Sequence, residues 1–181
     1  MSNVEVRRPS PDDVKELHAF FRTVITDTFQ KEGIGELVED IEEEVETKVK
    51  YLASDLESGG EKRYFLIAAK KGKIIGTIEY GPASNLIAKC TDYVLKDLNE
   101  VGTVFVHPDY QGMGIGNLLL QSIYNVFHEQ GIGEVCLDSG YKRAQTIWKK
   151  KFGEPDFLIE NLWGEGFHHM IWRVTVNKLL K

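Results

Sequence analysis

"VHPDYQGMGIGNLLL", residues 106–120, joins a strand-like run to a helix-like run through a turn rich in glycine. Gly112, Gly114 and Gly116 occupy alternate positions, and a run of leucines follows them. The N–H groups in the first turn of a helix have no partners inside the helix, and the helix dipole favours negative charge there. Because glycine has no Cβ atom, a phosphate can approach such a backbone closely. The stretch therefore predicts a site for a phosphorylated ligand.

Two well-known phosphate-binding patterns fit this stretch poorly. The P-loop requires Gly-Lys-[Ser/Thr], but Asn117 and Leu118 follow Gly116. The dinucleotide fingerprint G-x-G-x-x-G, counted from Gly112, requires a glycine where Asn117 stands. Asp138, at the end of the next predicted strand, does lie near the place of a ribose-binding acid. The short stretch after Asp138 leaves little room for the rest of a doubly wound domain.

A third pattern, Gln-x-x-Gly-x-Gly, fits residues 111–116 directly. Here the sequence resembles the GNAT superfamily of acyl-CoA N-acyltransferases, whose motif A is Q/R-x-x-G-x-G/A between the fourth strand and the third helix. "FVHPDYQGMGIGNLLL" matches that motif together with its approach strand. The resemblance covers nearly the whole chain, from "VEVRRPSPDDVKEL" to the last strand.

The composition of the 181 residues, 42% hydrophobic and 28% charged, is typical of one soluble globular domain, which we expect to span residues 1–181. A net charge of −6 disfavours nucleic-acid and anionic-membrane partners. Cys90 and Cys136 form no Cys/His cluster, so we expect buried, reduced thiols and no metal. The chain has no signal-type apolar region and no stretch of ~18 apolar residues, which predicts a cytoplasmic protein.

Hydrophobic periodicity and turn residues predict an order of strands and helices that agrees with this resemblance. We expect a single GNAT-like α/β (α+β) domain with a mixed central sheet of about six to seven strands, flanked by about four helices. The segment 82–99 is predicted as a loop with a short helix. The predicted strands are 4–8, 64–69, 73–80, 100–107, 133–139, 156–163 and 167–176, and the predicted helices begin near 11, 36, 115 and 143.

The resemblance implies where acetyl-CoA, the expected co-substrate, binds. The pantetheine arm is expected beside Phe105 and Val106, paired with the approach strand like an added strand. A backbone N–H near Val106 would polarise the thioester carbonyl. The contact is through the main chain, so both side chains can also pack in the core. The pyrophosphate is expected against the backbone of Gln111, Gly112, Met113, Gly114, Ile115 and Gly116.

Acyl transfer to an amine requires a base, because a protonated amine cannot attack. Glu100 is the first candidate, since it lies eleven residues before Gln111, where some protein-acetylating relatives place a glutamate base. Glu79 on the preceding strand is the second candidate. The structural alternative for both residues is a solvated carboxylate near the end of a strand.

The proton donor to the departing thiolate differs from the usual family pattern. Many relatives have a tyrosine in a segment like A-x-x-F-Y-E-K-L-G-F, but here "AQTIWKKKFGEPDF" places Trp148 at that position. Indole is not a useful acid near neutral pH, so we expect Trp148 to line the cofactor cleft. Tyr141 is the candidate acid and stands where an asparagine is often found; otherwise the thiolate leaves unassisted.

We therefore expect an acetyl-CoA-dependent N-acetyltransferase that acetylates a primary amine by direct attack in a ternary complex. The alternatives are a non-catalytic acyl-CoA-binding sensor, suggested by Trp148, and an NAD-type oxidoreductase. A covalent route through Cys136 has no support in the sequence. The acceptor is expected to be a small-molecule amine or a peptide. The acidic run 36–46 favours a cationic amine, although such a run is also typical of a solvated helical face. A homodimer is a candidate assembly, because relatives are often dimers.

Overall fold

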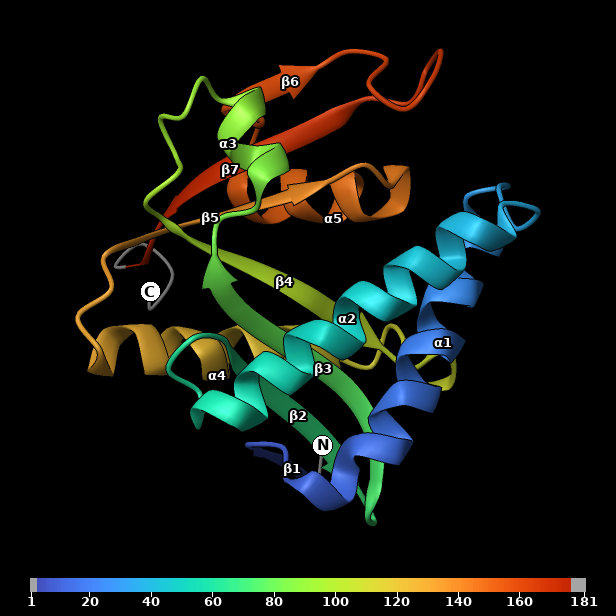
Figure 1. The fold of residues 1–181 in the computed structure, drawn as a ribbon, viewed down its shortest axis with the longest axis vertical. Coiled ribbons are helices and arrows are strands. Elements are labelled where there is room, and N and C mark those ends of the chain that lie inside the picture. Colours follow the sequence, from blue (N-terminus) through green and yellow to red (C-terminus); the bar gives the residue numbers. More distant parts are fainter. Residues whose placement is uncertain (1–2, 177–181) are drawn as a thin grey trace. The chain divides into compact units, whose positions relative to one another are not determined.

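The computed structural model describes residues 3–176 and confirms the predicted α/β (α+β) class. Within these residues, seven strands form a mixed sheet in the order β1-β2-β3-β4-β5-β7-β6, accompanied by five α-helices (Figure 1). The short helix α3 (Asn85–Cys90) is the fifth and lies in the segment predicted as a loop with a short helix. Internal contacts group the described residues into two units, 3–80 with 103–126 and 81–102 with 127–176. That the chain is one domain stays a prediction.

The first unit contains an antiparallel ladder and the helices that cover it. Strand β1 pairs with β2, and β2 pairs with β3 in the predicted hairpin. Helices α1 and α2 lie on one face of these strands, and the N-terminal part of α4 lies on the other (Figure 1). The bounds are β1 Val4–Arg7, α1 Val14–Lys31, α2 Val38–Ser58, β2 Tyr64–Lys70, β3 Lys73–Pro82, β4 Asn99–Val106 and α4 Ile115–Glu129.

Gly76 in β3 allows α4 to pack closely on the sheet. A Cβ atom built at Gly76 would lie 2.9 Å from Ile115 Cγ2 and 2.9 Å from Leu119 Cδ1, closer than real Cβ contacts allow. Ile115 and Leu119 are both buried, and the other apolar face residues of α4 continue their spacing of three and four. The absence of a side chain at Gly76 thus seats the first turn of α4 firmly on β3.

Asp55 anchors α2 to the sheet and gives a stability prediction. Its fully buried carboxylate accepts the Phe65 N–H (2.6 Å) and a bond from the Arg8 guanidinium (3.0 Å to Oδ1). Because Asp55→Ala leaves these donors without their acceptor, we expect it to lower the free energy of unfolding by roughly 3 kcal/mol or more, measured by urea denaturation. Glu42→Ala removes an exposed carboxylate that also binds an arginine, Arg22, and should hardly move the urea midpoint. Equal, small shifts for both variants would contradict the prediction.

The second unit pairs the start of β4 with three further strands. Asn99 and Glu100 pair in parallel with Val135 and Cys136 of β5, and β5 pairs antiparallel with β7. A cluster containing Cys136 and Ile171 packs against α3, whereas the Trp172 indole donates to the Gly153 carbonyl (2.9 Å) at the end of α5. Alternation along the strands therefore places α3 and α5 on opposite faces. The bounds are β5 Glu134–Ser139, α5 Lys142–Phe152, β6 Phe157–Ile159 and β7 His169–Thr175.

Two predicted strands are shorter than expected. The strand predicted over 156–163 is wrong beyond Ile159, and the one predicted from residue 167 begins at His169. Asn161 adopts a left-handed φ of +54°, and its side-chain oxygen accepts the Gly166 N–H (2.8 Å). This local turn replaces the sheet ladder across the intervening residues.

The end of α4 and the surroundings of the two cysteines were largely predicted. Gly131 has φ +71° just after α4, and the Ile132 N–H reaches back to the Phe127 carbonyl (2.9 Å), as in a glycine C-cap. Cys136 is buried as expected, but Cys90 is only half-buried. No helix within residues 3–176 is both long enough and apolar enough to cross a membrane.

Candidate active site

The turn between β4 and α4 is held in an open conformation by two left-handed glycines. His107 accepts the Asp109 N–H (3.3 Å) and starts a single 3-10 turn, after which the chain extends at Gln111. Gly112 has φ +74° and Gly114 has φ +82°, where residues with a side chain are strained. A Cβ atom at Gly112 would meet nothing within 4 Å, so glycine is required there by conformation and the space above the turn stays open.

The first turn of α4 directs unused N–H groups into this turn. The first bond of the helix runs from the Leu118 N–H to the Gly114 carbonyl (3.1 Å), so the N–H groups of Ile115 and Gly116 are not used in the helical ladder. The buried Ile115 side chain fixes the turn, and α4 is long enough to have a substantial dipole. No Cβ atom at Gly114 or Gly116 covers these N–H groups, and such groups at a helix N-terminus favour an anion.

Lys31 of α1 lies beside Gln111, the first residue of the glycine-rich pattern 111–116. The Gln111 amide donates to the Val106 carbonyl (3.2 Å), and its oxygen accepts a bond from Lys31 Nζ (3.0 Å). Lys31 also contacts Asp27 (2.6 Å). Sequence reasoning did not identify Lys31, because Gln111 lies 80 positions further along the chain and no local pattern connects them.

The end of β4 has a backbone N–H that takes no part in the ladder with β3. The His107 N–H donates to the Ile75 carbonyl of β3 (2.9 Å). Because backbone groups alternate in direction along a strand, the Val106 N–H points away from β3. Phe105 and Val106 are half-buried, and Phe105 meets the edge of the Phe21 ring (6.3 Å between centroids). Phe105 thus packs against the core, while the Val106 N–H points away from β3.

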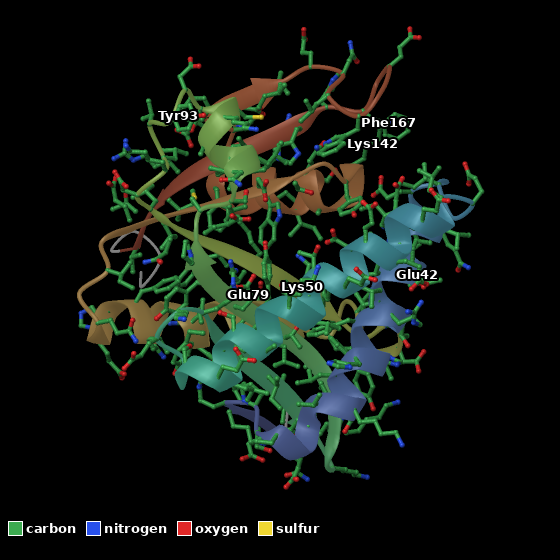
Figure 2. The ribbon with its side chains drawn as sticks, viewed as in Figure 1. Glu42, Lys50, Glu79, Tyr93, Lys142 and Phe167 are labelled. Carbon is green, nitrogen blue, oxygen red and sulfur yellow. The ribbon has the colours of Figure 1, made fainter. Side chains whose placement is uncertain are left out.

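Glu79 lies in a buried polar cluster on β3, close to α2 in Figure 2. It is 1% exposed; Arg63 donates to Oε2 (2.7 Å), and the Thr103 hydroxyl donates to Oε1 (3.1 Å). Burial raises the pKa of Glu79 above its usual value, although the charges of Arg63 and Lys48 oppose this shift. The cluster thus holds the Glu79 carboxylate against Thr103, two residues before Phe105, with a donor on each carboxylate oxygen.

Glu100, the first candidate base, belongs to the second unit. It is half-buried, and its Oε2 accepts the Ser84 N–H (2.7 Å). The Ser84 hydroxyl in turn accepts the Ile87 N–H (3.2 Å) and caps α3. Glu100 is therefore tied to the start of α3, which is a further role for its carboxylate beside the predicted one.

Tyr141 and Trp148 lie at the start and in the middle of α5. Tyr141 is half-buried at the N-cap, and its N–H donates to the Ser139 hydroxyl (3.0 Å). Trp148 is 9% exposed and stacks on Phe152, with 5.7 Å between ring centroids. The roles of Tyr141 as an acid and of Trp148 as a lining of the cofactor cleft stay predictions.

Side-chain contacts that the sequence did not predict join the segment 160–168 to His169 of β7 and to Lys142 at the start of α5. His169 Nε2 lies 2.8 Å from Asp138 Oδ2, and the Trp163 indole donates to His169 Nδ1 (3.1 Å). Nδ1 is thus an acceptor, which places the proton of a neutral His169 on Nε2, facing Asp138. Lys142 and Phe167 lie side by side in Figure 2, with 4.3 Å between Nζ and the ring centroid.

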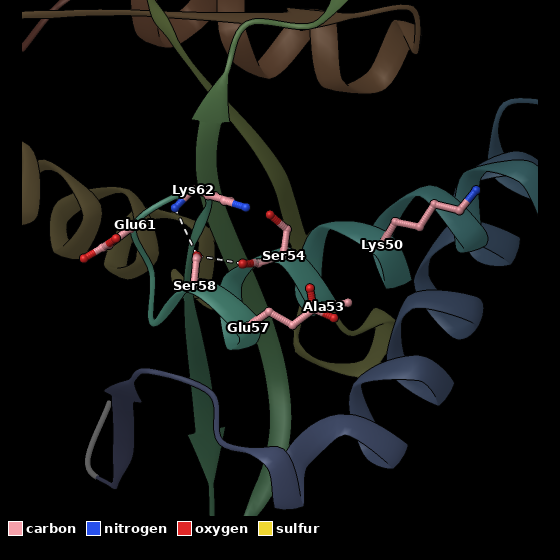
Figure 3. A pocket seen from close by; sticks show the side chains of 7 residues that line it. All are labelled: Lys50, Ala53, Ser54, Glu57, Ser58, Glu61 and Lys62. Atoms are coloured by element: carbon pink, nitrogen blue, oxygen red, sulfur yellow. Dashed lines mark hydrogen bonds between the residues drawn. The ribbon is translucent and has the colours of Figure 1, made fainter.

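A shallow hollow of about 450 Å³ lies along the C-terminal half of α2 (Figure 3). The Ser58 hydroxyl donates to the Ser54 carbonyl (2.7 Å) and accepts the Lys62 N–H (3.0 Å). No sequence-predicted site residue lines it; its lining residues are Lys50, Ala53, Ser54, Glu57, Ser58, Glu61 and Lys62. In the part of the chain that the structure describes, no group of three or more His, Cys, Asp or Glu side chains is arranged to hold a metal ion.

The thiol of Cys136 is poorly suited to a covalent route. Burial, with the charges of Glu100 and Asp138, raises the pKa of Cys136 to about 12, so the thiol stays protonated at neutral pH. We expect Cys136→Ala to retain acyl transfer. In the native protein, the half-buried Cys90 should react with Ellman's reagent first, and Cys136 should react only after unfolding. Loss of turnover in a folded Cys136→Ala variant would contradict this expectation and restore the covalent route.

Comparison with known proteins points to one family. The chain matches the model of the acetyltransferase (GNAT) family over residues 23–153. No curated protein matches it in sequence. The PaiA N-acetyltransferase from Thermoplasma acidophilum, solved in complex with coenzyme A, is 21% identical, with a TM-score of 0.69 over 97% of this chain and 99% of that one.

Two further solved structures have the same fold. The N-acetyltransferase from Staphylococcus aureus Mu50 is 15% identical, with a TM-score of 0.67 over 97% of this chain and 99% of that one. The ribosomal-protein-alanine N-acetyltransferase from Brucella melitensis is 18% identical, with a TM-score of 0.67 over 94% and 99%. At such identities the likeness establishes the fold.

Proposed function

The chain belongs to the acetyltransferase (GNAT) family, and we propose that it transfers the acetyl group of acetyl-CoA to a primary amine by direct attack within a ternary complex. It is an acetyl-CoA-dependent N-acetyltransferase of that family, which decides against the NAD-type oxidoreductase alternative. The observation that carries the proposal is the open turn between β4 and α4, where the left-handed Gly112 and Gly114 precede the unused N–H groups of α4.

In this proposal the residues of the turn and of β4 hold the two ends of acetyl-CoA. The backbone of residues 111–116 binds the diphosphate of coenzyme A, with the charge of Lys31 nearby. The pantetheine arm extends along Phe105 and Val106. The Val106 N–H, which points away from β3, donates to the thioester oxygen and stabilises the negative charge that develops there during attack.

The proton transfers are assigned to the two candidate glutamates and to Tyr141. Glu100 removes a proton from the acceptor ammonium, with Glu79 as the second candidate, and the neutral amine attacks the thioester carbon. The tetrahedral intermediate then collapses: the C–S bond breaks, coenzyme A leaves as a thiolate, and the nitrogen releases its remaining extra proton to solvent as the amide forms. Tyr141 supplies a proton to that thiolate, or the thiolate leaves unassisted. Trp148 lines the cofactor cleft.

The acceptor is proposed to be a cationic small-molecule amine or peptide. The first half of α2 exposes a row of carboxylates that would attract such a substrate: Glu39, Asp40, Glu42, Glu43 and Glu46. Among the structural neighbours, the Brucella protein is by its name an enzyme for a ribosomal-protein alanine, and it supports peptide amines as one class to test. Homodimer formation, localisation in the cytoplasm and the absence of nucleic-acid or membrane partners likewise remain proposals.

A screen of acceptors tests the function. Purified protein is incubated with acetyl-CoA and polyamines, amino acids, aminoglycosides or N-terminal peptides, and free thiol release is followed while calorimetry measures coenzyme A binding. We expect binding and thiol release with at least one amine. Binding without release across the panel would favour the acyl-CoA sensor, which the position of Trp148 suggests. No binding of coenzyme A would overturn both.

A further inference from the structure

We propose that Glu79 is a positioning residue: together with Thr77 it holds a left-handed bend at Thr103, and this bend aims the Val106 N–H at the thioester oxygen. The inference rests on the acetyl transfer proposed above, and it adds to that proposal the contacts that orient the Val106 N–H. All of the residues involved belong to the first unit, on β3, β4 and the helix and loop next to them.

Thr103 adopts a conformation that it would not keep without support. Its φ is +49°, in the left-handed region, and it is a buried β-branched residue inside a strand. Such a residue is a genuine outlier, and a strained φ of this kind costs of order 1–3 kcal/mol. Backbone strain of this size persists only where the surrounding groups hold it in place.

Two side chains of β3 hold Thr103 from the same side. The Thr103 hydroxyl donates to Glu79 Oε1 (3.1 Å), and the Thr77 hydroxyl donates to the Thr103 carbonyl (2.8 Å). Residues 77 and 79 are two apart on β3 and so share one face. The fully buried Thr77 hydroxyl thus adds a side-chain bond to the carbonyl of the bent residue.

Glu79 is itself fixed, which suits an anchor. Arg63 donates to Glu79 Oε2 (2.7 Å), and the Arg63 guanidinium lies 3.5 Å from the centroid of the Tyr51 ring. Both carboxylate oxygens therefore have a donor, and the arginine that binds one of them is held against an aromatic face. These bonds favour the charged form of Glu79 and hold its carboxylate toward Thr103 and Arg63.

The bend is close enough to Val106 to decide where its N–H points. Val106 is the third residue after Thr103, and the bond from His107 to Ile75 fixes the chain on the far side of Val106. A donor must lie about 2.7–3.1 Å from the oxyanion to stabilise it, and a misplacement of ~1 Å can lower a rate ~100-fold. Relaxing the bend should therefore lower the rate of acetyl transfer without disturbing the diphosphate turn.

Isosteric variants test this. We expect Thr103→Val to lower kcat roughly 10- to 30-fold, a fraction of the ~100-fold that a full misplacement can produce. Thr103→Ser, which keeps the hydroxyl, should recover most of the rate. Thr77→Val should resemble Thr103→Val. The Kd of coenzyme A, measured by calorimetry, should stay close to wild type in all three. Thr23→Val, which removes a hydroxyl bound to a carbonyl on the exposed face of α1, is the matched control and should leave kcat unchanged.

Glu79→Gln separates positioning from proton abstraction. In a double-mutant cycle, we expect the loss of kcat in Glu79→Gln to be non-additive with the loss of kcat in Thr103→Val. The pH–rate profile of Glu79→Gln should keep the acid limb of the wild type. The inference is wrong if Thr103→Val and Thr77→Val retain the kcat of the wild type, or if their kcat falls by the same factor as their affinity for coenzyme A. It is also wrong if the pH–rate profile of Glu79→Gln loses the acid limb. A wild-type protein that neither binds coenzyme A nor releases thiol rejects the proposed function as well, whereas active wild type with unaffected variants rejects only this inference.

Discussion

Replacing Gly114 by glutamate is expected to abolish measurable binding of coenzyme A while the fold survives. The new side chain would place a negative charge where the diphosphate is proposed to bind, at the start of α4. Repulsion between unit charges a few ångströms apart near a surface amounts to several kcal/mol, so affinity should fall at least ~100-fold. Calorimetry with coenzyme A and with its dephosphorylated analogue measures the effect.

Two matched variants separate charge from backbone strain. Gly114→Ala forces a Cβ atom into the same left-handed φ of +82° without adding charge, and it should weaken binding less than the glutamate does. Gly131→Glu places the same carboxylate at a left-handed glycine at the other end of α4, where a Cβ atom would meet nothing within 4 Å. It should destabilise the protein slightly and leave coenzyme A affinity intact. If folded Gly114→Glu bound coenzyme A like the wild type, the diphosphate would have to bind elsewhere.

Features that depend on neighbouring residues were predicted well from the sequence. The apolar spacing in α4 and the glycines before and after it are local, and the structure places Gly114 and Gly131 at its two ends as expected. The hairpin of β2 and β3 was equally accessible, because a lysine-glycine turn joins two short apolar runs.

Strand length was less accessible, because it depends on competition between local turns and the ladder. The residues after Ile159 read as a strand by composition, yet the Asn161 side chain bonds to the Gly166 N–H and turns the chain. Asparagine offers the backbone an alternative partner, and the sequence alone does not show which partner wins.

The partners of the candidate site residues could not be predicted, because they come from distant positions. Glu79 was identified as a carboxylate near the strand end, but its contacts with Arg63 and Thr103 depend on the register of β2, β3 and β4. Nothing local marks Thr103 as left-handed, since threonine is a good strand former. Lys31 reaches Gln111 only through the packing of α1.

Glu100→Gln is expected to produce the second large loss, and its pH dependence identifies the role. A primary alkyl amine with a pKa near that of lysine is mostly protonated at pH 7, so the base must remove a proton before attack. Removing a general base lowers rates ~100-fold or more, and we expect kcat/KM to fall by about that factor at pH 7. As pH rises toward the pKa of the amine, more of it is already neutral, so the gap between variant and wild type should narrow.

The structural role of Glu100 must be separated from this effect. Glutamine keeps an oxygen that can accept the Ser84 N–H, so the start of α3 should survive the change. Ser84→Ala removes the hydroxyl cap on Ile87 without touching Glu100 and reports what loosening α3 does by itself. Glu134→Gln alters a glutamate at the start of β5 and should leave the pH–rate profile unchanged. If Glu100→Gln lowered kcat/KM by the same factor at every pH from 6 to 10, as a loosened α3 would, Glu100 would be an anchor and the base would have to be sought at another residue.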